Sequence, residues 1–344
     1  MNTARRLPAE WEAQDAILLV WPQPHPGWDA VFPEVVTAYL NLIKTIRRFE
    51  PVILIAPDLQ TAEQVKQQTD PSPFLLTTYV AASNDCWARD FAPITVYEND
   101  RPRLINFKFN GWGGKFLAEL DNQLTLSLSK QGVFKNTPLE NHDWILEGGS
   151  IDSDGQGILL TTSRCLLSDS RNPGVTKEQT EKLLHETLGI HTVHWLEYGW
   201  LEGDDTDGHI DMLARFCNPD TIAYVQCKDK NDPHYEPLHQ MEHELKKISR
   251  ANGMPYHLLP LPLPSACCNQ KAERLPASYV NFLIINNAVL VPVYQQPEDK
   301  IALKQFEKIF PDREIIAVDA QPFIHESGSV HCLSMQIPKG VISS

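Results

Sequence analysis

The sequence lacks the features that would place it with membrane or nucleic-acid-binding proteins. No run approaches 18 apolar residues, which argues against a membrane-spanning helix. There is no dense basic tract, and 30 lysines and arginines against 44 aspartates and glutamates give a formal net charge of −14. The electrostatic footprint of a nucleic-acid-binding protein is therefore missing. Such a surface attracts a cationic small molecule, although solubility alone accounts for most of these charges.

The cysteines also lack the pattern of a disulfide framework. Their number is odd, their spacing is irregular, and two of them are adjacent: Cys86, Cys165, Cys217, Cys227, Cys267, Cys268 and Cys332. The N-terminal segment contains no apolar signal core. These two observations predict a cytoplasmic protein.

The chain contains enough apolar sequence for a large core. Of its 344 residues 42% are hydrophobic and 22% are charged, values close to those of ordinary globular proteins. This length fits one large domain or two smaller ones. No low-complexity segment and no convincing domain boundary is visible, and the proline-rich run from Leu259 to Pro264 is interpreted as a rigid connection.

Short β-branched runs alternate with helical patterns along the whole chain, which predicts an α/β fold. The expected strands are Ala16–Trp21, Val52–Ala56, Gly157–Thr161, Thr221–Val225, Phe282–Ile285, Val289–Val293 and Glu314–Val318. The clearest expected helices are Glu34–Arg48, Thr176–Leu188, Glu236–Ala251 and Glu298–Phe310.

Two segments supply a nucleophile and a proton carrier. Cys332 follows a Gly/Ser-rich loop and His331, a setting that can expose its sulfur, whereas the other six cysteines are interpreted as buried hydrophobes. His209 lies in the string Thr206-Asp-Gly-His-Ile-Asp211, and a histidine has a pKa suited to proton transfer. An extended backbone there would turn His209 and Asp211 towards one pocket.

Carboxylates elsewhere in the sequence fit a planar cationic substrate. Asp90 and Asp211 can grip the N–H fork of a guanidinium in bidentate fashion, although either alone is better explained as a turn residue. Glu147 precedes two glycines and would favour the imidazolium of His209 if the two are in contact. The polar loop residues recur at gaps of 57, 62, 72 and 51 residues, which hints at one functional loop per supersecondary unit: Asp90, Glu147, His209, Asn281 and Cys332.

Two further patterns need interpretation. Glycines flank Trp112, which favours a mobile aromatic flap that stacks on a cation, and Trp21 and Trp87 can do the same. The His239–His243 stretch matches a zinc-peptidase pattern. However, its histidines lie opposite the apolar stripe of the expected helix, so we interpret them as an exposed face.

Taken in order, these segments resemble the agmatine deiminase and bacterial peptidylarginine deiminase family of the guanidino-group-modifying pentein superfamily. The likeness runs from Pro8-Ala-Glu-Trp-Glu12 through Trp87-Ala-Arg-Asp90, Phe109-Asn-Gly-Trp-Gly-Gly114, Leu146-Glu-Gly-Gly149, Gly203 to Asp211 and Leu275 to Phe282, and ends at His331-Cys332. It covers essentially the whole chain.

The resemblance implies a pentein fold, a five-bladed α/β propeller of ββαβ-type units with pseudo-fivefold symmetry, forming a single catalytic domain over residues 1–344. It implies a small cationic guanidino substrate, no cofactor, no metal, and no nucleic-acid or membrane partner; a homodimer stays open. The residues that it assigns to catalysis are Cys332, His209, Asp90, Asp211 and Glu147. The substrate-binding residues that we expect are Asp90, Asp211, Trp87, Trp112 and Gly113.

The implied reaction is hydrolysis of a C–N bond in a linear amidine. Cys332 attacks the guanidinium carbon, ammonia leaves, and water resolves a covalent amidino-cysteine intermediate. Agmatine is the first choice of substrate, with N-carbamoylputrescine as product, a step of putrescine and polyamine biosynthesis. Peptidylarginine and free arginine are the nearest rivals, and the sequence leaves open whether Arg89, Lys115 or Arg171 meets an α-carboxylate.

Two alternatives come from other classes. A zinc hydrolase would use His209, Asp211 and Cys332 as ligands, and a binding protein would catalyse nothing. One departure from the family pattern bears on the pocket. Ser327 and Ser329 interrupt the glycines that commonly precede the His-Cys pair, and serine is strained wherever φ is positive.

Overall fold

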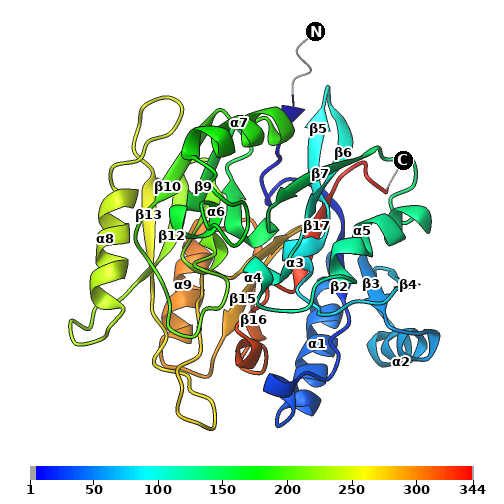
Figure 1. Cartoon of the computed structure of the whole chain (residues 1–344). Helices are drawn as coiled ribbons and strands as arrows, with labels where there is room; N and C mark the ends of the chain where they lie inside the picture. Colours follow the sequence, from blue (N-terminus) through cyan, green and yellow to red (C-terminus); the bar gives the residue numbers. More distant parts are fainter. Residues whose placement is uncertain (1–4, 343–344) are drawn as a thin grey trace.

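The computed structural model describes residues 5–342. The first four residues of the N-terminal segment predicted to lack a signal core lie outside this range, as do residues 343 and 344. Strands and helices alternate, so the predicted mixed α/β class is confirmed. In Figure 1, α2, α7 and α8 lie towards the outside of the molecule.

The strands of the described residues form five separate sheets. In spatial order these are β1 (Arg5–Arg6), β5 (Ile94–Glu98), β6 (Arg101–Lys108) and β7 (Leu139–Ile145); β10 (Thr192–Leu196), β9 (Ile158–Thr162) and β8 (Ile151–Ser153); β11 (Ala214–Asn218), β12 (Thr221–Gln226) and β13 (His257–Pro262); β14 (Leu283–Ile285), β15 (Ala288–Val293) and β16 (Glu314–Asp319); and β17 (Ser334–Pro338), β2 (Gln14–Val20), β3 (Val52–Ala56) and β4 (Leu76–Val80).

Helices connect the strands that pair in parallel. The α-helices are α1 (Phe32–Ile46), α2 (Leu59–Thr69), α3 (Ala88–Phe91), α4 (Gly111–Gly114), α5 (Asp121–Lys130), α6 (Ser163–Leu166), α7 (Lys177–Leu188), α8 (Tyr235–Leu245) and α9 (Asp299–Ile309). Four short 3-10 helices are η1 (Pro26–Trp28), η2 (Gly148–Ser150), η3 (Ile210–Met212) and η4 (Phe323–Glu326).

One strand pattern recurs in every sheet. An antiparallel pair is followed by a helical connection and a third strand in parallel, as in β11, β12, α8 and β13. A crossover between parallel strands needs such a connection. The sheet that contains β17 and β2 follows the same order, but its first strand comes from the C-terminal part of the chain and its second from the N-terminal part.

Most of the predicted strands are largely buried; the exception is β16, predicted over Glu314–Val318, in which only Val318 is buried. All five residues of β3 are buried, and its bounds match the predicted run from Val52 to Ala56. The expected α8 is shorter than predicted, because a turn and an isolated bridge follow Leu245. Its buried residues are Leu238, Met241 and Leu245, and His243 is exposed, which confirms that this histidine lies on the outer face.

The interpretation of Leu259–Pro264 as a connection is wrong for most of its length. Residues up to Pro262 form β13, which pairs with β12 through Pro260 and Pro262 among others. Because β13 lies at the edge of its sheet, a missing N–H on its outer side breaks no ladder bond. Within residues 5–342, no helix is both long and apolar enough to cross a membrane.

Candidate active site

A loop with one polar residue of interest precedes the first strand of each repeated pattern. Asp90 lies in α3 before β5, Glu147 before β8, His209 before β11, Asn281 before β14 and Cys332 before β17. The regular gaps in the sequence therefore correspond to one loop for each sheet. Residues far apart in the chain can meet at the place where these loops converge.

Cys332 lies in the buried part of this meeting place. Its Sγ is 3.6 Å from Oδ2 of Asp211, and the side-chain nitrogen of Asn281 donates to Sγ at 3.2 Å. Burial raises the pKa of the Cys332 thiol well above its usual value, and the Asp211 and Asp90 carboxylates raise it further. A thiolate here therefore needs a positive charge beside it.

The two expected clamp residues are both buried and anchored. Trp112 donates its indole N–H to one oxygen of Asp90 at 2.9 Å, and the backbone N–H of Gly149 donates to the other at 2.9 Å. Burial raises the pKa of Asp90 to about 6. Asp211 is held through Oδ2, 2.7 Å from Nδ1 of His331, whereas its Oδ1 has no hydrogen-bond partner among the described residues.

His209 is fully buried between two carboxylates. Its Nδ1 is 3.7 Å from Oδ1 of Asp90, and its Nε2 is 3.6 Å from Oε2 of Glu147. Burial lowers the pKa of His209, but Asp90, Cys165 and Glu147 raise it well above the usual value, and their effect prevails. The expectation that Glu147 favours the imidazolium agrees with this arrangement.

The reason given for expecting His209 and Asp211 to face one pocket is wrong, and neither residue is among those that line the pocket beside Cys332. The backbone is not extended, because η3 begins at Ile210 directly after His209. Both side chains nevertheless approach Gly149, where an added Cβ would lie 2.7 Å from Nδ1 of His209 and 3.0 Å from Oδ2 of Asp211. A glycine at this position lets the charged groups come together.

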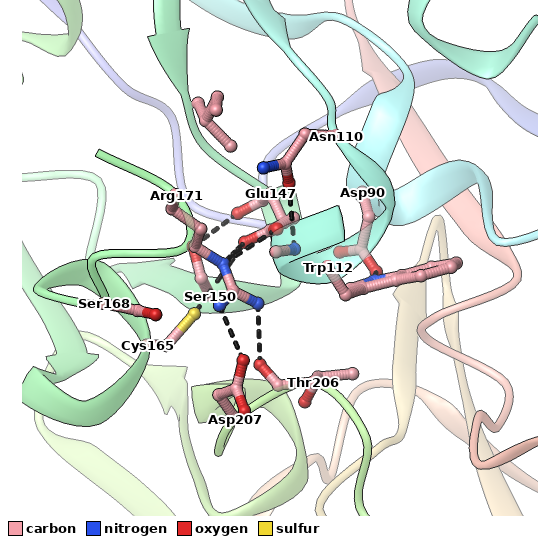
Figure 2. A network of polar contacts seen from close by, with 12 residues as sticks. Asp90, Asn110, Trp112, Glu147, Ser150, Cys165, Ser168, Arg171, Thr206 and Asp207 are labelled. Carbon is pink, nitrogen blue, oxygen red and sulfur yellow. Dashed lines mark hydrogen bonds and ion pairs between the residues drawn. The ribbon is translucent and has the colours of Figure 1, made fainter. Parts of the chain in front are cut away.

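Arg171 holds the carboxylate of Glu147 in place (Figure 2). Its Nε is 2.9 and 2.8 Å from the two oxygens of Glu147. The same guanidinium donates to Oδ2 of Asp207 at 2.8 Å and to the backbone oxygen of Thr206 at 2.9 Å. Arg171 therefore connects Glu147 to the loop that carries His209.

Two of the three expected tryptophans, Trp87 and Trp112, form walls of a pocket beside Cys332. The pocket is lined by Asp85, Trp87, Asp90, Trp112, Phe116, Asp205, Thr206, Met212, Glu326, Ser327, Gly328 and Cys332. Trp112 is 5% exposed and has a left-handed backbone with φ of 55°, so its contacts are those of a packed wall. Gly113 is not among the lining residues, and an added Cβ there would meet the Ser170 side chain at 2.3 Å. Trp21 is likewise not among them.

Only one of the two serines before His331 is strained. Ser327 has φ of 63°, a conformation that serine adopts at a cost of about 1–2 kcal/mol. Its hydroxyl donates to the backbone oxygen of Gly203 at 3.0 Å. Ser329 has no positive φ, and its hydroxyl is 3.2 Å from that of Tyr294. The Cβ-free Gly328 packs against the ring of Trp87.

Sequence reasoning missed the polar groups that support Cys332 and Asp211. His331 is 2.7 Å from Oε2 of Glu10 as well as from Asp211, and Arg215 donates to the same oxygen of Glu10 at 2.8 Å. Asn281 appeared in the regular spacing and in the Leu275 to Phe282 segment of the resemblance, but no role was assigned to it. Glu10 lies in the first segment of the family resemblance, which was the single signal that could have singled it out.

Comparisons with known proteins cover nearly the whole chain. The model of the Porphyromonas-type peptidyl-arginine deiminase family matches residues 6–338. A C. jejuni agmatine deiminase structure with substrate bound is 39% identical, with a TM-score of 0.90 over 98% of this chain and 97% of that one. An agmatine deiminase of Enterococcus faecalis is 30% identical, with a TM-score of 0.89 over 98% and 96%.

A more distant structure resembles the chain in fold alone. SxtG, an amidinotransferase from Microseira wollei, is 11% identical and has a TM-score of 0.55 over 98% of both chains. The mixed α/β architecture therefore extends to enzymes with little sequence in common.

Proposed function

Because the chain belongs to the Porphyromonas-type peptidyl-arginine deiminase family, we propose that it hydrolyses the guanidinium of agmatine to N-carbamoylputrescine and ammonia. The observation that carries this proposal is the convergence of one sulfur, two anchored carboxylates and one histidine. The sulfur of Cys332 is 3.6 Å from Asp211, and His209 is 3.7 Å from Asp90. A carbon gripped by both carboxylates would therefore lie within reach of the sulfur and near the histidine.

In the first half of the reaction, Asp90 and Asp211 hold the guanidinium by its N–H groups. The cation supplies the positive charge that the Cys332 thiol lacks, so binding favours the thiolate. The thiolate adds to the central carbon, the His209 imidazolium gives its proton to one nitrogen, and ammonia leaves. An N-alkylamidino group bonded to the sulfur of Cys332 remains.

In the second half, His209 is neutral and takes a proton from water as the oxygen adds to the same carbon. The tetrahedral adduct then expels the sulfur, and a urea-type product forms. One guanidinium and one water give one ureido group and one ammonium ion, so atoms and charge balance. Glu147 and Arg171 keep the ring of His209 in place through both halves.

The charges around the pocket favour agmatine over free arginine. Asp85, Asp205 and Glu326 line the pocket, and no lysine or arginine is among its described lining residues. A ligand with a second positive group fits this wall, whereas an α-carboxylate would be repelled. Burial raises the pKa of Asp85 to about 6 and that of Asp205 to about 7, so a cation nearby would favour their ionised forms.

The three cations considered for an α-carboxylate are all engaged elsewhere. Arg89 donates to the side-chain oxygen of Gln336 and is 3.7 Å from Glu10, away from the pocket. Lys115 is 2.7 Å from Asp207, and Arg171 is bound to both Glu147 and Asp207. A peptidylarginine substrate, which lacks the free α-carboxylate at an internal position, is the remaining rival.

The proposal also covers the architecture of the chain, its domain, its location and its oligomeric state. We treat the five sheets as five blades of a pentein propeller and residues 1–344 as one catalytic domain, in line with a family match over nearly all of that range. A cytoplasmic location stays a prediction from the sequence, as does a homodimer.

A substrate screen tests the proposal directly. Ammonia release would be measured with agmatine, arginine and a peptide with an internal arginine, and agmatine is expected to have the highest kcat/KM. Cys332→Ala should lower turnover by roughly 10⁴-fold or more, whereas Cys268→Ala, which alters an exposed cysteine, should leave it unchanged. Equal rates for peptide and agmatine would instead identify a peptidylarginine deiminase.

Two further measurements separate the mechanism from its alternatives. His209→Ala should abolish turnover and at most leave a stalled covalent substrate fragment on Cys332, seen by mass spectrometry of the intact chain. A strong chelator should not lower the rate, whereas a zinc hydrolase that used His209, Asp211 and Cys332 would be inactivated by it. Absence of ammonia from every guanidino compound would leave a binding protein.

A further inference from the structure

Three potential metal ligands converge beneath the candidate active site. Glu147, Cys165 and His209 each offer one ligand atom, and these atoms all lie within 4.8 Å of one another. The three side chains come from a loop before η2, from α6 and from the loop before η3. Among the described residues this is the one group of three or more such side chains that meets this distance. It contains neither Asp211 nor Cys332.

The spacing of these atoms is close to that of a tetrahedral zinc site. Sγ of Cys165 is 3.8 Å from Oε2 of Glu147, and Nε2 of His209 is 3.6 Å from the same oxygen. Zinc bond lengths of about 2.0–2.3 Å at tetrahedral angles give about 3.6 Å between sulfur and oxygen and about 3.4 Å between nitrogen and oxygen. Each of these two distances exceeds the ideal by about 0.2 Å, and the third pair of ligand atoms lies within 4.8 Å.

The histidine itself gives a second, independent indication. His209 is fully buried, yet neither of its ring nitrogens has a hydrogen-bond partner within residues 5–342. Nε2 faces the cluster, and Nδ1 is 3.7 Å from the Asp90 carboxylate. A metal-bound histidine commonly directs its other nitrogen at a carboxylate, and Arg171 orients the Glu147 ligand in the same supporting way (Figure 2).

The charges of the cluster also permit a zinc ion to replace two protons. Zn²⁺ would replace the thiol proton of Cys165 and one proton of the His209 imidazolium, so two positive charges enter and two leave. The thiolate forms a bond to the metal, and both protons pass to solvent. Glu147 keeps its ion pair with Arg171, and the net charge of the buried cluster does not change.

We propose that Glu147, Cys165 and His209 form a binding site for zinc or a similar borderline divalent cation, and that an ion bound there stops turnover. Cys165 is the residue that gives the site its sulfur ligand. The inhibition rests on the proposed function, because the ion would occupy the histidine that moves protons. The binding itself rests only on the three side chains.

The binding test uses chains that lack the nucleophile, so that Cys332 cannot supply a ligand. Metal-free Cys332→Ala protein is titrated with ZnCl₂ against a competing zinc indicator, and one ion per chain is expected. The double variant Cys165→Ala/Cys332→Ala should bind at least tenfold more weakly. The matched double variant Cys268→Ala/Cys332→Ala, which lacks only an exposed thiol, should bind like Cys332→Ala.

Cobalt provides a spectroscopic signature of the sulfur ligand. Co²⁺ added to Cys332→Ala should produce a thiolate-to-metal charge-transfer band, and the band should be absent when Cys165 is also alanine. Should the alanine destabilise the chain, Cys165→Ser keeps a side chain of similar size and removes the strong ligand. Zinc binding that survives the loss of Cys165 but disappears with Cys332 would overturn the proposal.

The activity arm separates this site from the proposed reaction. Zinc should inhibit the wild-type chain, and EDTA should restore the rate. Cys165→Ala should raise the inhibition constant for zinc at least tenfold above that of the wild-type chain, with the activity of each chain expressed as a fraction of its own zinc-free rate. If no guanidino compound is hydrolysed, the proposed function fails while the titration still decides the metal site. Equal inhibition of both chains would refute the assignment of Cys165.

Discussion

At the scale of single residues, Cys332 is surrounded by groups that disfavour its thiolate. The sulfur is buried, and the Asp211 and Asp90 carboxylates lie nearby, so its pKa is raised well above that of a free thiol. Asn281 donates one hydrogen bond to the sulfur, which does not offset them. The nucleophile therefore depends on the substrate cation for its ionisation.

Alkylation of the free protein tests this dependence. The rate of modification of Cys332 by neutral iodoacetamide should rise about tenfold per pH unit from pH 7 to 9 without levelling, because only the thiolate reacts. Asp211→Asn removes a negative charge 3.6 Å from the sulfur and should increase the rate at pH 8. Mass spectrometry of the peptide containing residue 332 gives the rate. A plateau below pH 8 would show that the thiolate forms without a cation.

Local sequence could identify the groups that do chemistry but not the groups that hold them. Cys332, His209 and Asp211 stand in distinctive strings, and the structure brings them to one place. Glu10 is 321 residues from the His331 that it contacts, and no local pattern reports so distant a pairing. Asn281 was noticed through its regular spacing and its place in a segment of the family resemblance, and neither signal shows that it donates to the sulfur of Cys332.

At the scale of elements, Arg171 holds two loops in fixed positions relative to one another. It follows α6, and its buried side chain binds Glu147 before η2 and the Thr206–Asp207 stretch before η3. A planar fork of donors is required for three acceptors in these directions. The positions of His209 and Glu147 relative to one another therefore depend on one guanidinium.

Replacing this side chain tests that dependence. Arg171→Lys keeps the charge but not the fork, and we expect kcat to fall at least tenfold and stability to fall by about 2 kcal/mol. Arg164→Lys, an exposed position in α6, is the matched control and should change neither quantity. Ammonia release and urea unfolding give the two numbers. Unaltered kcat in Arg171→Lys would show that the lysine suffices.

The predictability of the elements follows their burial. Strands buried on both faces read as apolar β-branched runs, so β3 and β12 were predicted almost to the residue. By contrast, β7 has the sequence LENHDWI with no buried residue, and β13 ends in four alternating leucine and proline positions at the edge of its sheet. Their pairing partners determine these strands, and a single sequence does not show those partners.

At the scale of the whole molecule, Glu10 joins the N-terminal segment to distant sheets. One oxygen accepts from the backbone N–H of Ile284 at 2.7 Å, and the other accepts from Arg215 at 2.8 Å and lies 2.7 Å from His331. Burial opposes its ionisation, but Arg215 and His331 hold its pKa well below the usual range. This buried carboxylate therefore ties the N-terminal segment to the loop of the nucleophile.

Neutralising Glu10 should weaken the whole assembly. Glu10→Gln leaves buried Arg215 without its closest counter-charge, and we expect a loss of about 3 kcal/mol in the free energy of unfolding near pH 7. Glu12→Gln, two residues away and partly exposed, should cost less than about 1 kcal/mol.

The pH dependence of this difference has a definite sign. Because the pKa of Glu10 is lowered in the folded chain, its stabilisation is complete above the unfolded value of about 4.3 and declines as the pH falls below it. Urea unfolding of both variants between pH 3 and 7 gives the comparison. A difference that stayed constant over this interval would mean that the charge of Glu10 is not what stabilises the fold.

The pairing of β17 with β2 has a consequence for the order in which the protein is synthesised and folds. The strand that completes this sheet spans Ser334–Pro338, and the reactive sulfur lies two residues before it. A nascent chain can build its other four sheets before residues 334–338 are synthesised, but the sheet that contains β2 stays incomplete until they are added. The reactive sulfur and the strand that completes this sheet therefore enter the chain together, after the partners that they meet.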